Sequence, residues 1–141
     1  MELSPAGLSL IKRFEGLRTR AYLCPAGVWT IGYGSTGPHV AEGLVISEAQ
    51  AEAMLRSDLV RFEEAVRRHA LPATQSQYDA LVSFAFNVGV DAFARSTLLR
   101  RHRSGDFASA AFQFARWDKV RGRVVTGLAR RRAAERKLYS S

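Results

Sequence analysis

Cysteine and histidine are both scarce in this chain of 141 residues. Its one cysteine, Cys24, excludes a disulfide within the chain, so the fold does not depend on an oxidising compartment. Its three histidines, His39, His69 and His102, lie far apart and have no Cys, Asp or Glu at ligand spacing. We therefore expect exposed histidines, no metal site and no cofactor.

The chain also lacks a targeting or membrane-spanning run. The apolar face of residues 1–16 is broken by Pro5, Gly7 and Lys12, unlike a secretory signal or a membrane span. No glycine-rich loop opens a helix, which argues against a phosphate-binding loop. We expect a protein that folds in a cytoplasm, unless a leader has been removed.

Acidic residues are scarce in the C-terminal third. Residues 95–141 hold 13 Lys and Arg against Asp106, Asp118 and Glu135, which gives +10, whereas residues 1–94 carry −2 of the total of +8. Such a field favours a polyanion, either a cell-wall polymer, an anionic lipid surface or nucleic acid. Because no recognition helix or sheet with paired aromatics accompanies the charge, we expect no specific nucleic-acid partner.

The hydrophobic pattern, with 47% hydrophobic residues, predicts one α+β domain over residues 1–141. Ser4 and Pro5 begin a helix that ends at Glu15, and a Ser47–Gln50 capping box opens a long helix. The expected parts are an N-terminal helix 4–15, a three-stranded β lobe 17–46, a connecting helix 47–69 and a helical lobe 72–141. The sheet is too small to be stable alone, so we expect it to pack on helices and form a cleft with them.

The helical lobe should centre on an almost wholly apolar helix, 78–86, capped by residues 74–77. Shorter helices are expected over 96–103, 106–117 and 128–138, with a loop at 122–127. Aromatic residues at helical spacing in this lobe are expected to be core residues. They are Phe107, Phe112, Phe114 and Trp117.

Residues 14–36 contain the candidate catalytic residues. Glu15 ends the first helix, and two β-prone runs, 20–24 and 28–33, are joined by a Pro-Ala-Gly turn, which predicts a hairpin. Cys24 and Thr30 then lie on facing strands beside the helix end that carries Glu15. Apolar neighbours favour the protonated form of a carboxyl group, as a general acid requires. The alternatives are a solvated Glu15 and a Cys24 that only packs the hairpin.

The spacing of Glu15, Cys24 and Thr30 within FEG…AYLCPAGVWTIGYG resembles the active-site signature of the phage-type lysozymes, the endolysin muramidases of tailed phages. The resemblance continues through QSQYDALVSFAFNVG, RSTLLRRHRSGDF, ARW and GLARRRAAE. It implies a lysozyme-like fold and hydrolysis of the β-1,4 bond between N-acetylmuramic acid and N-acetylglucosamine in peptidoglycan. It also implies Glu15 as the acid, Thr30 as the residue that places water, and Cys24 at the position of the second catalytic group.

Two departures from the family pattern concern this site. Most relatives hold Asp where this chain has Cys24, and a thiol with a pKa of about 8.5 is a weak base at neutral pH unless an arginine lowers that pKa. Ser35 stands where many relatives show His.

Further site residues follow from the chemistry of sugars, which bind to aromatic faces, amides and hydroxyls. The candidates for the saccharide groove are Tyr33, Ser35, Phe86, Asn87 and Ser96, with a core position as the alternative for Phe86. Arg130 and Arg131 are candidates to pair with Glu15 and orient it, or else are plain surface charge.

Other functions stay open at this point. A lytic transglycosylase needs only one carboxylate, which fits Cys24, and the basic C-terminal third suggests a membrane-binding or nucleic-acid-binding module. For the lysozyme function we expect a monomer with peptidoglycan as its substrate and anionic lipid as a second contact. It would be made in the host cytoplasm and reach the wall through a pore made by another protein.

Overall fold

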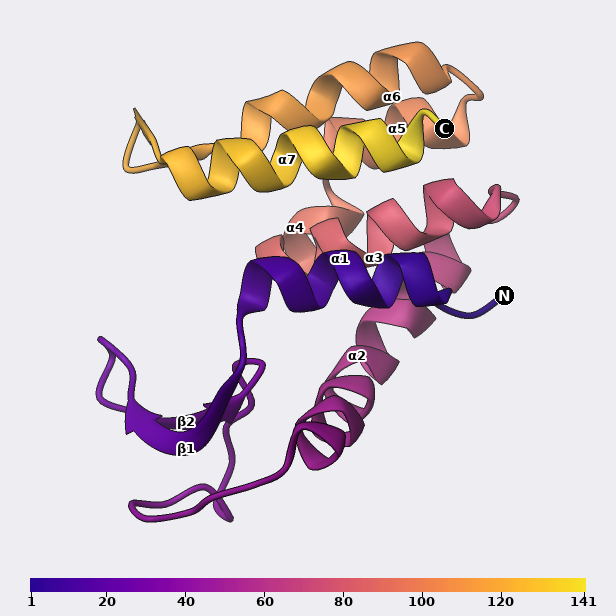
Figure 1. Cartoon of the computed structure of the whole chain (residues 1–141). Coiled ribbons are helices and arrows are strands. Elements are labelled where there is room, and N and C mark those ends of the chain that lie inside the picture. Colours follow the sequence, from indigo (N-terminus) through magenta and orange to yellow (C-terminus); the bar gives the residue numbers. More distant parts are fainter. The chain divides into compact units, whose positions relative to one another are not determined.

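The computed structural model describes residues 1–141 (Figure 1). The chain divides into two units, one of residues 11–60 and one that combines residues 1–10 with residues 61–141. Both boundaries fall inside helices, namely α1 (Pro5–Glu15) and α2 (Glu48–Ala70). The class is α+β and mainly helical, as predicted.

Helix α1 begins as its sequence predicts. Pro5 is its first residue, and the Ser4 hydroxyl accepts a hydrogen bond from the Gly7 N–H at 3.3 Å, which satisfies one of the unpaired donors at the helix start. The buried residues Leu8 and Ile11 lie on its apolar face. The helix ends at Glu15 because Gly16, with φ +73°, adopts a left-handed backbone conformation that favours glycine.

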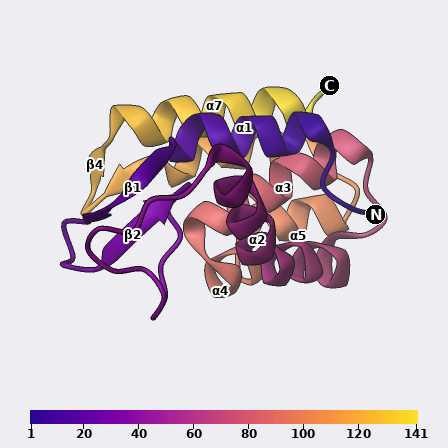
Figure 2. The same cartoon turned by 60° about the horizontal axis from the view of Figure 1, so that its bottom comes forward.

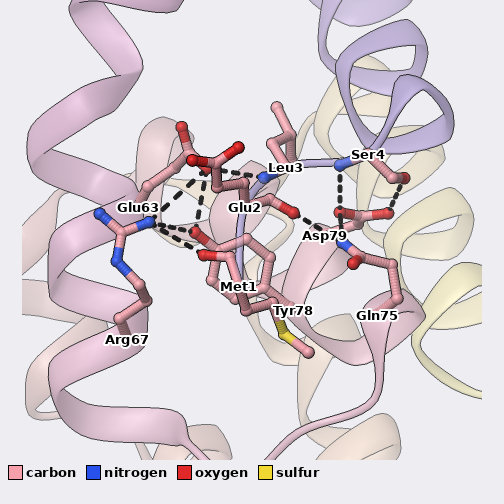
Figure 3. A network of polar contacts seen from close by, with 9 residues as sticks. All are labelled: Met1, Glu2, Leu3, Ser4, Glu63, Arg67, Gln75, Tyr78 and Asp79. Carbon is pink, nitrogen blue, oxygen red and sulfur yellow. Dashed lines mark hydrogen bonds and ion pairs between the residues drawn. The ribbon is translucent and has the colours of Figure 1, made fainter.

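A polar network holds the first residues of the chain against α2 and α3 (Gln75–Val88) (Figure 3). Glu63 of α2 accepts hydrogen bonds from the Leu3 N–H at 2.7 Å and from the Tyr78 hydroxyl at 3.0 Å. Asp79 of α3 accepts one from the Ser4 N–H at 3.0 Å and one from the Ser4 hydroxyl. Two carboxylates therefore fix the start of α1.

The 11–60 unit contains a two-stranded antiparallel sheet of β1 (Arg18–Leu23) and β2 (Trp29–Gly32) (Figure 2). The predicted third strand is wrong, because residues 34–46 form turns and pair only through two isolated bridges, Arg20–Val45 and Ile31–Ser35. Gly37 and Gly43, both with positive φ, interrupt the extended backbone that a strand requires. A small core of Ala21, Ile31 and Val40 stabilises the unit, with Trp29, Leu44, Ile46 and Met54 packed against it.

Helix α2 agrees with the expected 47–69 helix to within one residue. The capping box is present, because the Gln50 N–H donates to Ser47 Oγ at 3.1 Å and Gln50 Oε1 accepts from the Ser47 N–H at 2.8 Å. One face of α2 is apolar and buried along Ala51, Leu55, Leu59, Phe62 and Val66, and Met54 is half-buried.

The unit of residues 1–10 and 61–141 is built around α3, which is buried from Gln77 to Ala85 as predicted. Helix α7 (Thr126–Tyr139) packs along it. The Phe84 ring contacts Phe93, Phe114 and Trp117 edge-on at 5.3–6.4 Å between centroids. The remaining helices are α4 (Val90–Ala94), α5 (Thr97–Arg103), α6 (Phe107–Gln113) and the 3-10 helix η1 (Phe114–Trp117).

Three details of this unit differ from the sequence prediction. Helix α4 was not expected, and the predicted 106–117 helix is divided into α6 and η1. The predicted loop near 122 is partly a hairpin of β3 (Lys119–Val120) and β4 (Arg123–Val124). Its two turn residues, Arg121 and Gly122, both have positive φ, as in the tight turns that suit the twist of paired strands.

Burial also corrects two expectations about rings. Phe107 and Phe112 are 44% and 55% exposed, so only part of the predicted aromatic set belongs to the core. His102 is buried, not exposed, and bridges the Tyr139 hydroxyl and the Ala70 carbonyl at 2.7 Å each. Since a carbonyl only accepts, His102 Nε2 carries a proton in this arrangement.

Neither a transmembrane helix nor a metal-binding cluster is part of the structure. None of the helices combines the length and the apolar character that crossing a membrane requires. No three His, Cys, Asp or Glu side chains are grouped as ligands for an ion.

Candidate active site

Cys24 and Thr30 lie together at the end of the β1–β2 hairpin. Cys24 directly follows β1, and Thr30 lies in β2 opposite Tyr22. The turn between the strands is closed by two backbone hydrogen bonds, from the Cys24 N–H to the Val28 carbonyl at 3.0 Å and from the Gly27 N–H to the Cys24 carbonyl at 2.8 Å. The predicted hairpin and its turn are confirmed.

The surroundings of Cys24 favour the thiolate. Hydrogen bonds from the backbone N–H groups of Val28 and Ala26 lower the pKa of the Cys24 thiol. The expected cause was an arginine side chain, so the structure assigns the effect to the backbone of the turn instead. The backbone of this turn therefore makes the Cys24 thiolate easier to form without a charged side chain beside it.

The Thr30 side chain is 5% exposed and has a fixed partner. Its hydroxyl donates to the Val28 carbonyl at 3.0 Å. A hydroxyl has one proton and two lone pairs, so this bond leaves lone pairs that can accept a hydrogen bond from water. The bond to Val28 therefore fixes the direction of the Thr30 hydroxyl.

Glu15 is half-buried at the C-terminal end of α1, beside the turn that follows β2. In that turn Ile31 and Ser35 exchange two backbone hydrogen bonds of 2.8 and 2.9 Å. A Cβ atom added at Gly34, whose φ is +92°, would lie 3.5 Å from Glu15 Oε1. That distance is an ordinary contact, so the positive φ and not lack of space favours glycine here, and Glu15 lies close to the β2 hairpin within the same unit.

Two predicted saccharide contacts in the same unit, Tyr33 and Ser35, are buried. The Ser35 hydroxyl donates to Asp58 Oδ2 at 2.6 Å and is 2% exposed. The Tyr33 ring is 4% exposed, and Lys12 Nζ lies 5.6 Å from its centroid. The hydrogen bond from Lys12 to Glu52 raises the pKa of Lys12 and lowers that of Glu52. Burial leaves little of Tyr33 or Ser35 available to a ligand.

Three further predicted contacts belong to the other unit. Phe86 is half-buried and packs edge-on against Phe62 at 5.1 Å, and its role as a saccharide contact stays a prediction. Ser96 is buried and caps α5, because its hydroxyl accepts from the Leu99 N–H at 3.0 Å and donates to the Phe93 carbonyl at 2.7 Å. Of these three candidates, Asn87 alone is exposed.

Arg130 and Arg131 differ in their surroundings. Arg130 is exposed, whereas Arg131 is 4% exposed and contacts Glu135 Oε2 through its Nε at 3.2 Å. Arg131 Nη2 also donates to the Ser83 carbonyl at 3.2 Å. The burial of Arg131 shows that it is not plain surface charge. Pairing with Glu15 stays a prediction.

A buried group of charges in α7 was missed by the sequence analysis. Arg132 and Glu135 are 1% and 0% exposed, and Glu135 Oε2 accepts a hydrogen bond from the buried Ser83 hydroxyl at 2.5 Å. A signal was present, because Arg131 and Arg132 precede Glu135 by four and three residues, which is the spacing of ion pairs on one helix face. That spacing is so common on exposed helices that it does not by itself indicate burial.

Comparison with known proteins identifies the family. The phage lysozyme family model matches residues 12–135. The endolysin of Acyrthosiphon pisum secondary endosymbiont phage 1 is 45% identical over 146 residues, which cover 100% of this chain and 99% of the endolysin. The muramidase domain of SpmX from Asticaccaulis excentricus has a TM-score of 0.92 at 43% identity, over 99% of this chain and 98% of that domain. A mutant of P22 lysozyme has a TM-score of 0.93 at 38% identity, over 100% and 99% of the two chains. This chain belongs to the phage lysozyme family.

Proposed function

We propose that this phage-type lysozyme hydrolyses the β-1,4 bond between N-acetylmuramic acid and N-acetylglucosamine, with Glu15, Thr30 and Cys24 as its catalytic residues. The protein is a lysozyme of the endolysin type that acts on peptidoglycan. The observation that carries the residue assignment is that Cys24 and Thr30 adjoin in the unit that also contains Glu15. The relatives are an endolysin, a muramidase domain and a lysozyme, so the transglycosylase and binding-module alternatives gain no support.

The proposed reaction divides the work between an acid and a base. The Glu15 carboxyl group gives its proton to the glycosidic oxygen as the bond to the sugar carbon breaks, and an oxocarbenium-like centre develops. A water molecule held by the Thr30 hydroxyl attacks that carbon, and the Cys24 thiolate accepts its proton. Loss of that proton from Cys24 to solvent and uptake of one by Glu15 restore the starting state.

The test of the acid is Glu15→Gln, which removes the transferable proton and keeps the shape of the side chain. We expect loss of wall lysis by several orders of magnitude, since general acid catalysis alone contributes roughly 10²–10⁴-fold, with little change in the melting temperature. Glu42→Gln, an exposed carboxylate of the same unit, serves as the matched control and should lyse like the wild type. Turbidity clearing of cells by folded Glu15→Gln at the wild-type rate would refute the assignment.

Product chemistry tests the reaction type separately from the residues. Hydrolysis adds water across the glycosidic bond, so mass spectrometry of digested peptidoglycan should find new reducing ends. Anhydro ends would show that a hydroxyl of the sugar had replaced water, and the proposed roles of Thr30 and Cys24 would then be wrong.

The proposed endolysin function also implies an oligomeric state and a cellular location for the protein. We infer a monomer, which light scattering after size-exclusion chromatography measures directly. We also infer synthesis in the host cytoplasm and release to the wall through a pore made by another protein. Lysis of intact cells that express this chain alone, without any pore protein, would contradict the second inference.

A further inference from the structure

A cavity of about 460 Å³ lies beside α5 and the end of α4, and arginines dominate its lining. The residues that line it all belong to the unit that includes residues 61–141. They are Ala94, Arg95, Ser96, Leu99, Arg100 and Arg103. Cavities of roughly 300–1,000 Å³ have the size that small ligands occupy. This one offers a ligand three guanidinium groups beside the apolar surface of Ala94 and Leu99.

The protein supplies no negative charge to these three guanidinium groups. No acidic residue lines the cavity, and none of the three arginines forms an ion pair, whereas Arg67 of the same unit pairs with Glu63. The acid nearest to Arg95 in the sequence is Asp91, four residues earlier in α4, and it makes no ion pair either. The positive charge that faces the cavity is therefore uncompensated within the chain.

Stability gives no reason to gather these arginines. Arg100 and Arg103 are three residues apart on α5, a spacing at which like charges lie close together and destabilise a helix. The side chains of the three make one hydrogen bond within the protein, from Arg100 Nη2 to the Thr97 hydroxyl at 3.2 Å. A concave surface lined by one sign of charge focuses the electric field and attracts a counterion.

A second cavity of the same unit shows that arginines around a hollow do not by themselves lack a countercharge. Its volume is about 400 Å³, and it is lined by Arg61, Glu64, Ala65, Arg68, His69 and Val90. The Glu64 carboxylate there offsets part of the positive charge of the two arginines. Only the cavity beside α5 combines several arginines with no carboxylate, so the two cavities differ in their capacity for an anion.

The free hydrogen-bonding groups of the cavity beside α5 are almost entirely donors. Its one hydroxyl, that of Ser96, already donates to the Phe93 carbonyl and accepts from the Leu99 N–H. A guanidinium group donates and never accepts, so the ligand must carry acceptors and negative charge. The two oxygens of a carboxylate are matched by the fork of one arginine, whereas the tetrahedral oxygens of a phosphate can engage several arginines at once.

We propose that this cavity binds a phosphate group, with the guanidinium groups of Arg95, Arg100 and Arg103 as its hydrogen-bond donors. The group is either free inorganic phosphate or a terminal phosphate carried by a lipid headgroup, since both present the same oxygens. The inference goes beyond the proposed function and does not rest on it. Phosphate binding needs neither an acid nor a base, so Glu15→Gln should bind phosphate like the wild type whatever its effect on lysis.

The first test is calorimetric titration with inorganic phosphate at constant ionic strength. Arg95→Gln and Arg103→Gln each remove one charge and one bidentate fork. We expect each to raise the dissociation constant at least about tenfold, which corresponds to about 1.4 kcal/mol. Arg68→Gln is the matched control, because it removes the same charge from the cavity that contains Glu64, and it should bind phosphate like the wild type. An equal loss of affinity in Arg68→Gln would overturn the inference, since binding would then follow net charge alone.

A second measurement distinguishes free phosphate from a lipid phosphate. Phosphatidylcholine vesicles that contain phosphatidic acid present a terminal phosphate, and co-sedimentation measures how much protein they bind. If inorganic phosphate does not bind but these vesicles retain the wild type and Arg68→Gln more strongly than Arg103→Gln, the lipid headgroup is the ligand. Absence of binding to both probes, or vesicle binding that falls equally in Arg68→Gln and Arg103→Gln, would overturn the inference.

A third measurement needs no variant, so it decides the question even if a substitution disturbs the fold. The side-chain Nε–H resonances of Arg95, Arg100 and Arg103 should shift when the probe that binds is added to the wild-type protein. The Nε–H resonance of Arg68 should stay in place. Shifts of the three resonances no larger than that of Arg68 would overturn the inference.

Discussion

At the scale of single residues, the turn at Cys24 lowers the pKa of the thiol that we propose as the general base. Backbone N–H groups stabilise negative charge without desolvating it, and the Cys24 side chain receives them from Val28 and Ala26. The direction of the effect matters for function. A lowered pKa means that the thiolate forms at a lower pH than in an unperturbed cysteine, whose pKa is about 8.5.

The pH profile of lysis follows from that direction. If Cys24 is the base, activity should rise with pH as the thiolate forms, and the lowered pKa of Cys24 places that rise below the range of an unperturbed thiol. Cys24→Asp should move the rise in activity to a pH lower by several units. The reason is that the reference pKa is about 3.9 for an aspartate carboxyl group and about 8.5 for a cysteine thiol. Cys24→Ser should lose activity by orders of magnitude. Rates of lysis measured from acid to alkaline pH for the three proteins provide the comparison, and matching profiles at wild-type rates would show that Cys24 only packs the hairpin.

At the scale of elements, the start of α1 is constrained more tightly than its sequence indicates. A glycine inside a helix normally costs about 1 kcal/mol relative to alanine. A Cβ atom at Gly7, however, would lie 2.7 Å from Asp79 Cγ and 2.7 Å from Leu3 Cδ1. Asp79 cannot easily move away, since it is 1% exposed and accepts hydrogen bonds from Ser4 (Figure 3).

We therefore expect Gly7→Ala to destabilise the protein, in contrast to the usual effect in a helix. Overpacking of this kind typically costs about 1–3 kcal/mol, which exceeds the gain in helix propensity. Gly127→Ala in α7 is the matched control, because no atom lies within 4 Å of a Cβ at that glycine and its backbone is helical. It should leave stability unchanged or raise it. Urea unfolding of both variants measures the two changes, and a stabilised Gly7→Ala would contradict the packing argument.

At the scale of the whole molecule, charge and chemistry reside in different parts of the sequence. Eleven of the 13 basic residues from 95 to 141 are exposed, the exceptions being Arg131 and Arg132. The proposed catalytic residues all lie between residues 15 and 30. Exposed charges attract a polyanion over a distance set by the Debye length, which falls from about 10 Å at 0.1 M salt to about 3 Å at 1 M.

Salt should consequently act on wall binding and not on the chemical step. We expect added salt to weaken binding to intact wall sacculi while turnover of a short neutral oligosaccharide changes little. Sedimentation of the protein with sacculi and a turnover assay, each over a range of salt, test the two halves. Equal loss of both would indicate that the basic residues take part in catalysis or that salt disturbs the fold.

The elements that depend on local contacts were predictable from the sequence. Each capping box, at Ser47–Gln50 and at Thr74–Gln77, joins residues three apart, so its hydrogen bonds are independent of the rest of the fold. The turn after Cys24 likewise follows from Pro25 and Gly27. The spacing of Glu15, Cys24 and Thr30 within this local frame was enough to indicate the family.

Only the tertiary structure decided the contacts between residues that are distant in the sequence. His102 was expected at the surface, yet its partners, Ala70 and Tyr139, lie 32 and 37 positions away. The Arg132–Asn87 hydrogen bond spans 45 positions, and no local pattern marks either residue as its partner. The physical reason is that helical spacing fixes which residues share a face, while burial and hydrogen-bond partners depend on which other helix covers that face. Sequence periodicity determined the helices of this lysozyme, and the packing of α7 on α3 determined that two of its arginines are buried and that one of them holds Asn87.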